Sequence, residues 1–374
     1  MARKSGETRA RAPGRVNWIG EHTDYNGGLV LPAPIDLDTR VRVALRDDRR
    51  VTGRSRERPD AAAELDAPPA SDWLDYPRGM ARALTAAGWL PESGFELHVE
   101  SDLPQGAGLS SSAALLAASA LALLAAAGRH VAPEERPELA RLCQRAESEF
   151  AGVPCGLMDH YAVLCGRRDS ALWLDCATLE TRAVELPDSH AILIFDTGVE
   201  RSLRAGKYAE RRAECARALA GAQAALARPL ASLSQLAAAE LPRLAGALDP
   251  VALRRARHVV SENRRVAEFA EAVARGDLAA AGECLFASHE SLRDDYQVSC
   301  PEADALVADS RALLGCAGAR MTGAGFGGCT LHWVDAAHAD AFAQALGGRF
   351  RARFGRTPRH WRAMPGTPAE LSSA

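Results

Sequence analysis

The chain has 374 residues, of which 47% are hydrophobic and 25% are charged. This length exceeds what one compact core usually serves, so two domains are expected. The formal net charge of −3 gives no global basic field, which argues against nucleic acid or an anionic membrane surface as a partner.

Nine cysteines are scattered along the chain, and no two form a Cys-x-x-Cys pair. Zinc-ribbon and thioredoxin-type motifs are therefore excluded, and the pattern is typical of small buried residues in a reducing compartment. The first residues hold no apolar stretch of the secretory kind, and the longest apolar run, 113–127, is too short to cross a bilayer. We expect a cytoplasmic protein without a membrane segment.

The segment GRVNWIGEHTDYNGG, 14–28, concentrates polar side chains in one short stretch with four glycines. Only Val16, Trp18 and Ile19 could anchor it in a core. A solvated charged turn does not account for large apolar residues interleaved with the polar ones. The composition predicts a loop held close to a ligand.

The next elements are expected from hydrophobic spacing. Apolar residues alternate toward Leu45, which predicts a strand, and the charged, Pro/Ala-rich region 46–70 predicts surface loop. Residues 73–88 have the pattern of an amphipathic helix closed by glycine, and 94–104 alternate as a strand.

The stretch LPQGAGLSSSAALLAASALALL, 103–124, places Gly106 and Gly108 before three serines and a strongly helical run. Glycines let a ligand approach the backbone, and a helix N-terminus suits phosphate. Serines before a helix are also ordinary N-caps, so both interpretations stay open. The chain contains no Walker motif, and the third glycine of the dinucleotide fingerprint is missing.

Two carboxylates follow. Glu147 lies on the flank of a helical apolar stripe, where spacing alone favours a surface residue. Asp159 lies in the apolar stretch 157–163, and a carboxylate there is costly without a partner. Asp159 is therefore a candidate general base or ion-paired group.

The pattern restarts after residue 186, which predicts a division into domains 1–187 and 188–374. Residues 190–198 predict a buried strand, 201–288 are dominated by helix, and 316–334 predict a glycine loop running into a strand. Within it MTGAGFGGC, 321–329, is either a tight turn with a bulge or a backbone surface pressed against a ligand. Alternating helices and strands indicate an α+β or α/β fold.

Together these segments resemble the GHMP small-molecule kinases, and the first resembles the galactokinase signature in particular. GRVNWIGEHTDYNGG, LPQGAGLSSSAAL and MTGAGFGGC correspond to the three family motifs. FAGVPCGLMDHY, DTGVERSLRAGKYAERRAEC and SHESLRDDYQVSCPE follow galactokinase order, so the resemblance covers most of the chain. It implies an α+β fold with an N-terminal domain of the ribosomal-protein-S5-like kind and a ferredoxin-like C-terminal domain, with the site between them.

The resemblance also implies a reaction, the transfer of the ATP γ-phosphoryl group to the 1-hydroxyl of α-D-galactose. It implies Asp159 as catalytic base with Arg15 beside it. The implied sugar contacts are Glu21, His22, Thr23, Asp24, Gly156, Asp159 and Tyr208. The implied ATP contacts are Gly106, Ala107, Gly108, Leu109, Ser110, Ser111 and Ser112, with Trp73 at the adenine. The implied Mg²⁺ ligands are Ser112 and Glu147, and a monomer is expected.

This assignment gives the polar segment a physical reason. A site that distinguishes hexose epimers must hydrogen-bond individual hydroxyls, because the wrong sugar leaves buried polar groups unpaired. Arg15 would lower the pKa of a neighbouring carboxyl and stabilise charge on the transferred phosphoryl group.

Two alternatives and several departures from the family pattern remain. The substrate could be a related monosaccharide such as N-acetylgalactosamine, or the protein could be a non-catalytic sensor of galactose and ATP. The complete serine turn and Asp159 favour an enzyme. Glu200, Arg201, His160 and Trp18 depart from the usual family residues, which leaves the fine sugar specificity open.

Overall fold

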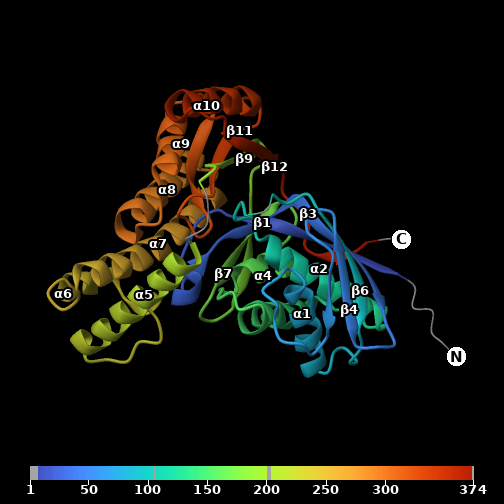
Figure 1. Cartoon of the computed structure of the whole chain (residues 1–374). Helices are drawn as coiled ribbons and strands as arrows, with labels where there is room; N and C mark the ends of the chain where they lie inside the picture. Colours follow the sequence, from blue (N-terminus) through green and yellow to red (C-terminus); the bar gives the residue numbers. More distant parts are fainter. Residues whose placement is uncertain (1–6, 105, 200–203, 373–374) are drawn as a thin grey trace.

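The computed structural model describes residues 7–104, 106–199 and 204–372. Within these residues the strands form three sheets, and Figure 1 shows helices packed around them. Glu200 and Arg201, two of the departures noted above, lie outside the described residues.

The six-stranded sheet is built from the N-terminal half and one short strand from the C-terminus, in the order β13-β1-β3-β6-β4-β5. Its strands are Thr8–Asn17 (β1), Pro32–Leu45 (β3), Arg50–Ser55 (β4), Ala61–Glu64 (β5), Phe95–Ser101 (β6) and Glu370–Leu371 (β13). All neighbours are antiparallel except β4 and β6, which run parallel. A small sheet of β2 (Leu29–Val30), β7 (Ser170–Asp175) and β8 (Thr181–Glu185) lies beside it.

The expectation of surface loop throughout 46–70 is wrong in part, because β4 and β5 lie there. Val51 of β4 is fully buried and pairs with Phe95, while Arg50 and Arg54 remain in solvent. Only alternate residues of such a strand face the core, so its apolar signal is weak. Residues 66–72 form irregular backbone, as expected.

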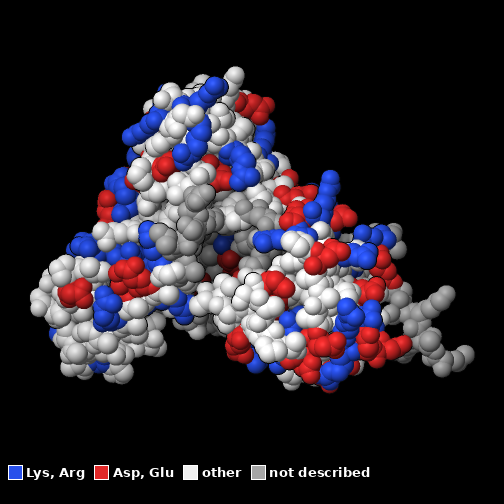
Figure 2. Space-filling model, viewed as in Figure 1, with Lys and Arg blue, Asp and Glu red and all other residues white. Residues whose placement is uncertain are grey.

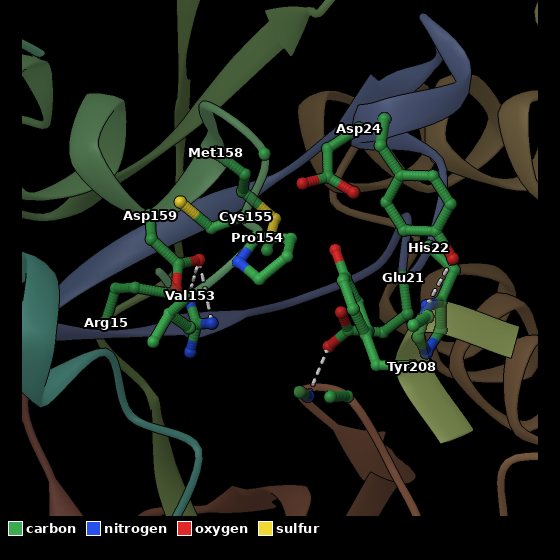
Figure 3. Close-up of a pocket in the computed structure, with 15 residues that line it drawn as sticks. Arg15, Glu21, His22, Asp24, Val153, Pro154, Cys155, Met158, Asp159 and Tyr208 are labelled. Carbon is green, nitrogen blue, oxygen red and sulfur yellow. Dashed lines mark hydrogen bonds and ion pairs between the residues drawn. The ribbon is translucent and has the colours of Figure 1, made fainter. Parts of the chain in front are cut away.

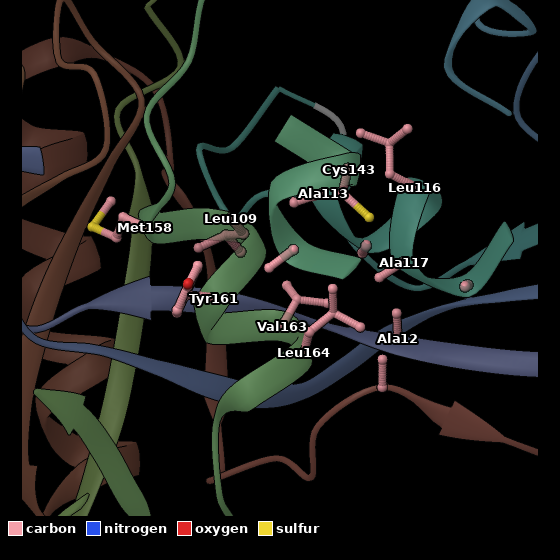
Figure 4. Packing of buried hydrophobic residues seen from close by; sticks show 14 of the residues in the cluster. Ala12, Leu109, Ala113, Leu116, Ala117, Cys143, Met158, Tyr161, Val163 and Leu164 are labelled. Atoms are coloured by element: carbon pink, nitrogen blue, oxygen red, sulfur yellow. The ribbon is translucent and has the colours of Figure 1, made fainter. Parts of the chain in front are cut away.

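Four helices cover the six-stranded sheet and place the catalytic candidates. They are Asp75–Ala86 (α1), Ser111–Ala126 (α2), Arg136–Arg145 (α3) and Met158–Cys165 (α4). Helices α2 and α4 lie directly on the strands of the sheet, whereas α1 and α3 pack against α2. Helix α2 is buried along almost its whole length, as expected of a helix that is apolar on every side. Figure 4 shows its first turns meeting Cys143 of α3 and Val163 and Leu164 of α4. This packing holds the N-terminus of α2 close to the first turn of α4, which carries Asp159.

The four-stranded sheet belongs to the C-terminal half, with order β10-β11-β9-β12 and antiparallel neighbours throughout. Its strands are His190–Asp196 (β9), Cys316–Thr322 (β10), Cys329–Asp335 (β11) and Arg359–Ala363 (β12). The helices of this half are Arg204–Leu226 (α5), Leu241–Leu244 (α6), Pro250–Ala274 (α7), Leu278–Ser291 (α8), Pro301–Arg311 (α9) and Ala339–Phe354 (α10). The order of strands and connecting helices is the βαββαβ arrangement of ferredoxin-like folds, which confirms the predicted α+β class.

Both faces of β9 are buried, which explains its continuous apolar sequence. Leu193 and Phe195 pack toward α9 and α10, whereas Ile192 and Ile194 join the core that continues into the N-terminal half. Trp18 completes this shared core, with its ring centroid 5.3 Å from that of Trp333. One hydrophobic core therefore spans both halves of the chain. The predicted domain boundary between residues 187 and 188 stays a prediction.

None of the described helices has the length and apolar character needed to span a membrane.

Candidate active site

A cavity of about 280 Å³ lies where the two halves meet. Figure 3 shows Arg15 and Asp159 on one side of it and Asp24, His22 and Tyr208 on the other. Figure 2 shows the visible face hollowed near its centre, with acidic and basic side chains mixed around it. The cavity is lined by Arg15, Glu21, His22, Asp24, Tyr25, Val153, Pro154, Cys155, Gly156, Met158, Asp159, Tyr208, Ala209, Gly323 and Ala324. We call it the Asp159 cavity.

Arg15 and Asp159, 144 residues apart, form an ion pair in which two guanidinium nitrogens contact one carboxylate oxygen. Nε and Nη2 of Arg15 lie 2.9 and 2.8 Å from Oδ1 of Asp159, and Ser110 Oγ donates to Oδ2 at 2.5 Å. Nη1 of Arg15 donates to the carbonyl of Gly108 at 2.6 Å. One guanidinium therefore fixes the carboxylate and the glycine loop relative to each other.

These contacts set the charge of Asp159. Burial alone would raise the pKa of this carboxyl, but the Arg15 guanidinium and the Ser110 hydroxyl outweigh burial and lower the pKa below its ordinary value. Asp159 is consequently anionic at neutral pH and able to accept a hydrogen bond from a substrate hydroxyl.

The loop between β1 and β2 turns sharply to present its polar residues. Gly20 has φ of 97° and His22 has φ of 62°, and a side chain at Gly20 would lie 2.5 Å from the carbonyl of Leu29. Thr23 does not line the cavity, which corrects its expected sugar contact. Its hydroxyl lies 2.8 and 2.7 Å from the carbonyls of Gly20 and Leu29, because the tight turn needs that donor. Thr23 supports the loop.

Glu21 reaches from this loop to the third glycine motif. Its Oε1 accepts from the backbone N–H of Gly323 at 2.7 Å and from the hydroxyl of Thr322 at 3.1 Å. Nη2 of Arg320 lies 3.5 Å from the same oxygen, and both side chains are buried. The glycine motif is thus the connection between β10 and β11 and borders the Asp159 cavity at Gly323.

An aromatic cluster surrounds His22. Nδ1 of His22 lies 2.8 Å from the hydroxyl of Tyr25, which lies 2.8 Å from the hydroxyl of Tyr296, and the ring of Tyr208 lies 5.9 Å from that of His22. Burial and the neighbouring His258 lower the pKa of His22 to about 3. His22 is therefore a neutral hydrogen-bonding group rather than a charged one.

Asp24 faces Asp159 across the cavity (Figure 3). Burial and the charge of Asp159 raise the pKa of Asp24 to about 6. Gly156 lies directly against it, since a Cβ on Gly156 would be 1.7 Å from Oδ2 of Asp24. Only glycine fits at position 156 without displacing the Asp24 carboxylate, which gives a physical reason for Gly156 among the expected sugar-site residues.

A second cavity of about 140 Å³, here called the Trp73 cavity, opens beside the N-terminus of α2. It brings together Trp73, Ser111 and Ser112 as expected of nucleotide contacts, along with Tyr76 and Arg58. Gly106 and Gly108, with φ of 72° and 79°, form the turn before it. The side chains of Ala107 and Leu109 are buried in the core, so these two residues could offer a phosphate only their backbone. The hydroxyl of Ser110 is taken by Asp159.

Glu147 lines neither cavity. It lies in a π-helical turn, Ala146–Phe150, at the end of α3, and it is buried, so the surface position favoured by spacing is wrong. Nε2 of His160 lies 2.9 Å from its Oε2. π-helical turns often occur at functional sites.

Sequence reasoning missed several residues that hold the site. Arg320, Thr322, His258 and Tyr296 connect the C-terminal half to the loop 20–26, and Nε2 of His258 lies 3.0 Å from the carbonyl of Glu21. The available signal was Arg320, a charge between the apolar residues of a strand. The sequence around His258, within an Arg-rich helix, contains no comparable signal.

Comparison with known proteins assigns the family. Residues 75–167 match the GHMP kinases N terminal domain, 269–352 match GHMP kinases C terminal, and 3–45 match the galactokinase galactose-binding signature. The galactokinase of Roseiflexus sp. (strain RS-1) is 44% identical over 356 residues, which cover 93% of this chain and 88% of that relative. The galactokinase of Homo sapiens is 41% identical over 348 residues, covering 89% and 85%.

Solved structures agree. The Lactococcus lactis galactokinase complexed with galactose superimposes with a TM-score of 0.92 at 35% identity, covering 98% of this chain and 95% of the other. The Methanococcus jannaschii mevalonate kinase superimposes with a TM-score of 0.69 at 17% identity, covering 97% and 100%, which shows a shared fold alone. With this fold, these motifs and these relatives, the chain belongs to the galactokinase family of the GHMP kinases and is an ATP-using kinase.

Proposed function

We propose that the 1-hydroxyl of α-D-galactose lies against Asp159 and receives the γ-phosphoryl group of ATP bound in the Trp73 cavity. The Arg15–Asp159 pair carries this proposal, because it connects the Asp159 cavity, which is large enough for a monosaccharide, to Gly108 and Ser110 of the Gly106–Ser112 turn. The galactose complex of the Lactococcus lactis relative, with its high structural similarity, supports a sugar in the same fold.

In this proposal the chain acts mainly by positioning and charge neutralisation, which is what phosphoryl transfer requires. Asp159 accepts a hydrogen bond from the 1-hydroxyl and takes its proton as the oxygen attacks phosphorus. Its lowered pKa makes it a weak base, so its stronger contribution is to orient the hydroxyl. Arg15 and the backbone N–H groups at the start of α2 stabilise the charge on the phosphoryl oxygens.

The remaining polar groups recognise the sugar. Asp24, with two carboxylate oxygens toward the cavity, accepts from hydroxyls, while neutral His22 and the phenol of Tyr208 donate or accept. The pairing of Glu21 with Gly323 and Thr322 fixes one of its oxygens and orients the other.

Ser112 and Glu147 are the proposed ligands of Mg²⁺, which prefers hard oxygen donors. Both residues fit this role. Ser112 places a hydroxyl on the Trp73 cavity, and Glu147 is a buried carboxylate whose oxygen Oε2 contacts an imidazole nitrogen of His160. When bound, the ion would neutralise charge on the ATP phosphates.

A related sugar such as N-acetylgalactosamine stays an alternative substrate, and a cytoplasmic monomer stays a prediction. A panel of galactose, N-acetylgalactosamine, glucose and talose, followed by ADP release, separates the substrates. We expect galactose to give the highest kcat/KM. Size-exclusion chromatography with light scattering tests the monomer.

The catalytic assignment is tested by Asp159→Asn. We expect kcat to fall by about 10³-fold, since general-base groups contribute about 10²–10⁴-fold, while ATP binding by calorimetry is largely kept. Asp47→Asn, an exposed carboxylate, is the matched control and should behave as wild type. Turnover by Asp159→Asn near the wild-type rate would refute the role of Asp159.

A further inference from the structure

Behind Asp159 lies a cluster of three different metal-ligating side chains. A carboxylate oxygen of Glu147, Sγ of Cys155 and a ring nitrogen of His160 all lie within 4.8 Å of one another. No other group of three or more His, Cys, Asp or Glu side chains comes this close in 7–104, 106–199 and 204–372. The three residues come from the turn after α3, the loop 151–157 and α4, and the helices α3 and α4 both pack against α2 (Figure 4).

The donor set selects a kind of ion. Thiol sulfur and imidazole nitrogen are ligands of Zn²⁺ and similar borderline-soft divalent ions, whereas Mg²⁺ takes oxygen ligands. In a tetrahedral zinc site, bonds of about 2.0–2.3 Å place neighbouring donor atoms about 3.5 Å apart. Side-chain shifts of about 1 Å would bring the cluster to that spacing, and three protein ligands leave a fourth position for water.

The ring of His160 is free to offer a lone pair. It is fully buried, and Nε2 lies 2.9 Å from Glu147 Oε2. Nδ1 of His160 has no hydrogen-bond partner among the described residues. The Glu147 carboxylate therefore holds the proton on Nε2 in the metal-free protein. An ion that takes Glu147 as a ligand removes this acceptor, and a shift of the proton to the unpartnered Nδ1 then lets the lone pair of Nε2 face the ion.

Access to the cluster runs through the sugar side. Cys155 is partly exposed and lines the Asp159 cavity (Figure 3), while Glu147 and His160 lie deeper. Burial and the nearby carboxylates, Glu147 first, raise the pKa of the Cys155 thiol. An ion binding there displaces the thiol proton to solvent, and its two positive charges offset the carboxylates.

From these contacts we propose that Glu147, Cys155 and His160 form a binding site for a thiophilic divalent cation, represented by Zn²⁺. Glu147 also lies near the Trp73 cavity, which Tyr76 lines. Its charge reaches Tyr76, since burial first and Glu147 second raise the pKa of Tyr76 to about 12. If Glu147 is an Mg²⁺ ligand, as the proposed function holds, the bound Zn²⁺ withdraws it and inhibits the kinase. Mg²⁺ and Zn²⁺ then compete for one carboxylate.

The site is tested by titrating reduced, metal-free protein with Co²⁺, which reports thiolate ligation by a charge-transfer absorption. We expect saturation at one equivalent, displacement by Zn²⁺ and no displacement by millimolar Mg²⁺. Cys155→Ser should lose the absorption, while Cys165→Ser, a matched partly buried thiol on α4, should keep it. An unchanged absorption in Cys155→Ser, or displacement by Mg²⁺, would overturn the proposal.

His160→Gln provides a second variant whose fold is protected, because glutamine keeps an N–H donor for Glu147. It should weaken Co²⁺ binding more than tenfold, since removal of a group one shell farther out already costs about 10–100-fold. Unchanged affinity would remove His160 from the site. Inhibition by Zn²⁺, measured relative to each variant's own rate without Zn²⁺, separates the proposed Zn²⁺ site from the proposed role of Glu147 as an Mg²⁺ ligand. Binding with the thiolate signature but without inhibition supports the site and contradicts the role of Glu147 in holding Mg²⁺.

Discussion

The two cavities are built differently. The Asp159 cavity takes its lining from both halves of the chain, including Tyr208 and Gly323, whereas the described residues that line the Trp73 cavity all lie between Thr39 and Leu115. Sugar recognition therefore depends on how the halves pack together, while nucleotide contacts depend on local structure around α2. Substitutions should therefore separate sugar binding from nucleotide binding. Each should change the KM for one substrate and leave the KM for the other substrate unchanged.

The largest separation is expected from Gly156→Ala. The new Cβ would lie 1.7 Å from Oδ2 of Asp24 and must push that carboxylate out of place. A hydrogen bond to a charged group contributes about 1.5–3 kcal/mol, so the KM for galactose should rise up to about 100-fold. The KM for ATP should not change. Gly246→Ala, where nothing lies within 4 Å, is the control. A galactose KM within twofold of wild type would show that Asp24 does not contact the sugar.

Trp73→Ala should produce the opposite pattern. Loss of an aromatic surface under a base costs about 1–3 kcal/mol, so the KM for ATP should rise about tenfold with the galactose KM unchanged. Trp73 also donates from Nε1 to the carbonyl of Pro59 and packs on Gly53, so some stability is lost as well. Trp73→Phe, which keeps a ring, should restore most of the ATP affinity. An unaltered ATP KM in the alanine variant would remove the adenine from this cavity.

Thr322→Val probes the contact between halves. It removes the hydroxyl that lies 3.1 Å from Glu21 Oε1 while nearly keeping the side-chain volume. One neutral-to-charged hydrogen bond is lost, so the galactose KM should rise about fivefold and the ATP KM should stay constant. Thr330→Val makes the same change on β11, where the hydroxyl contacts His332 instead. Equal effects of both variants on the galactose KM would contradict a specific role for the Glu21 contact.

The smallest effect is a pH dependence on the sugar side. With a pKa of about 6, Asp24 loses most of its charge between pH 7.5 and 5.5, so kcat/KM for galactose should fall about fourfold. Asp24→Asn should lower kcat/KM and flatten this change. A profile that is unchanged in Asp24→Asn would assign the titration to another group.

The same pKa has a consequence for stability. Because the folded pKa is raised, the stability linked to protonated Asp24 is fully present below its ordinary pKa and is lost as pH rises through about 6. Asp24→Asn should therefore be more stable than wild type at pH 7.5, on the order of 2 kcal/mol, and equal to it near pH 3.5. Thermal unfolding without ligands at both values checks the sign.

The local parts of the site were predictable from sequence. Arg15 and Asp24 stand in a motif that resembles the galactokinase signature, Asp159 is a carboxylate among apolar residues, and the glycine–serine turn opens an apolar helix. Spacing alone left both an α+β and an α/β fold open, and the resemblance to the GHMP kinases decided for α+β. These signals are local, so no long-range pairing had to be known.

The contacts between the halves were not predictable in the same way. Nothing within the loop 20–26 indicates that Glu21 meets Arg320 and Gly323, about 300 residues later, or that its carbonyl meets His258. The hydroxyls of Thr23 and Ser110 show the same limit of sequence reasoning. A single hydroxyl can serve a ligand or the protein, and only the packed structure shows that these two serve the protein.

The most direct test of the central claim, that sugar and nucleotide meet at Asp159, is a crystal structure with galactose, Mg²⁺ and a non-hydrolysable ATP analogue. We predict O1 of galactose within about 3.2 Å of Asp159 and the γ-phosphate between it and the N-terminus of α2. A galactose that turns another hydroxyl toward Asp159, or a phosphate chain outside the Gly106–Ser112 turn, would contradict the account.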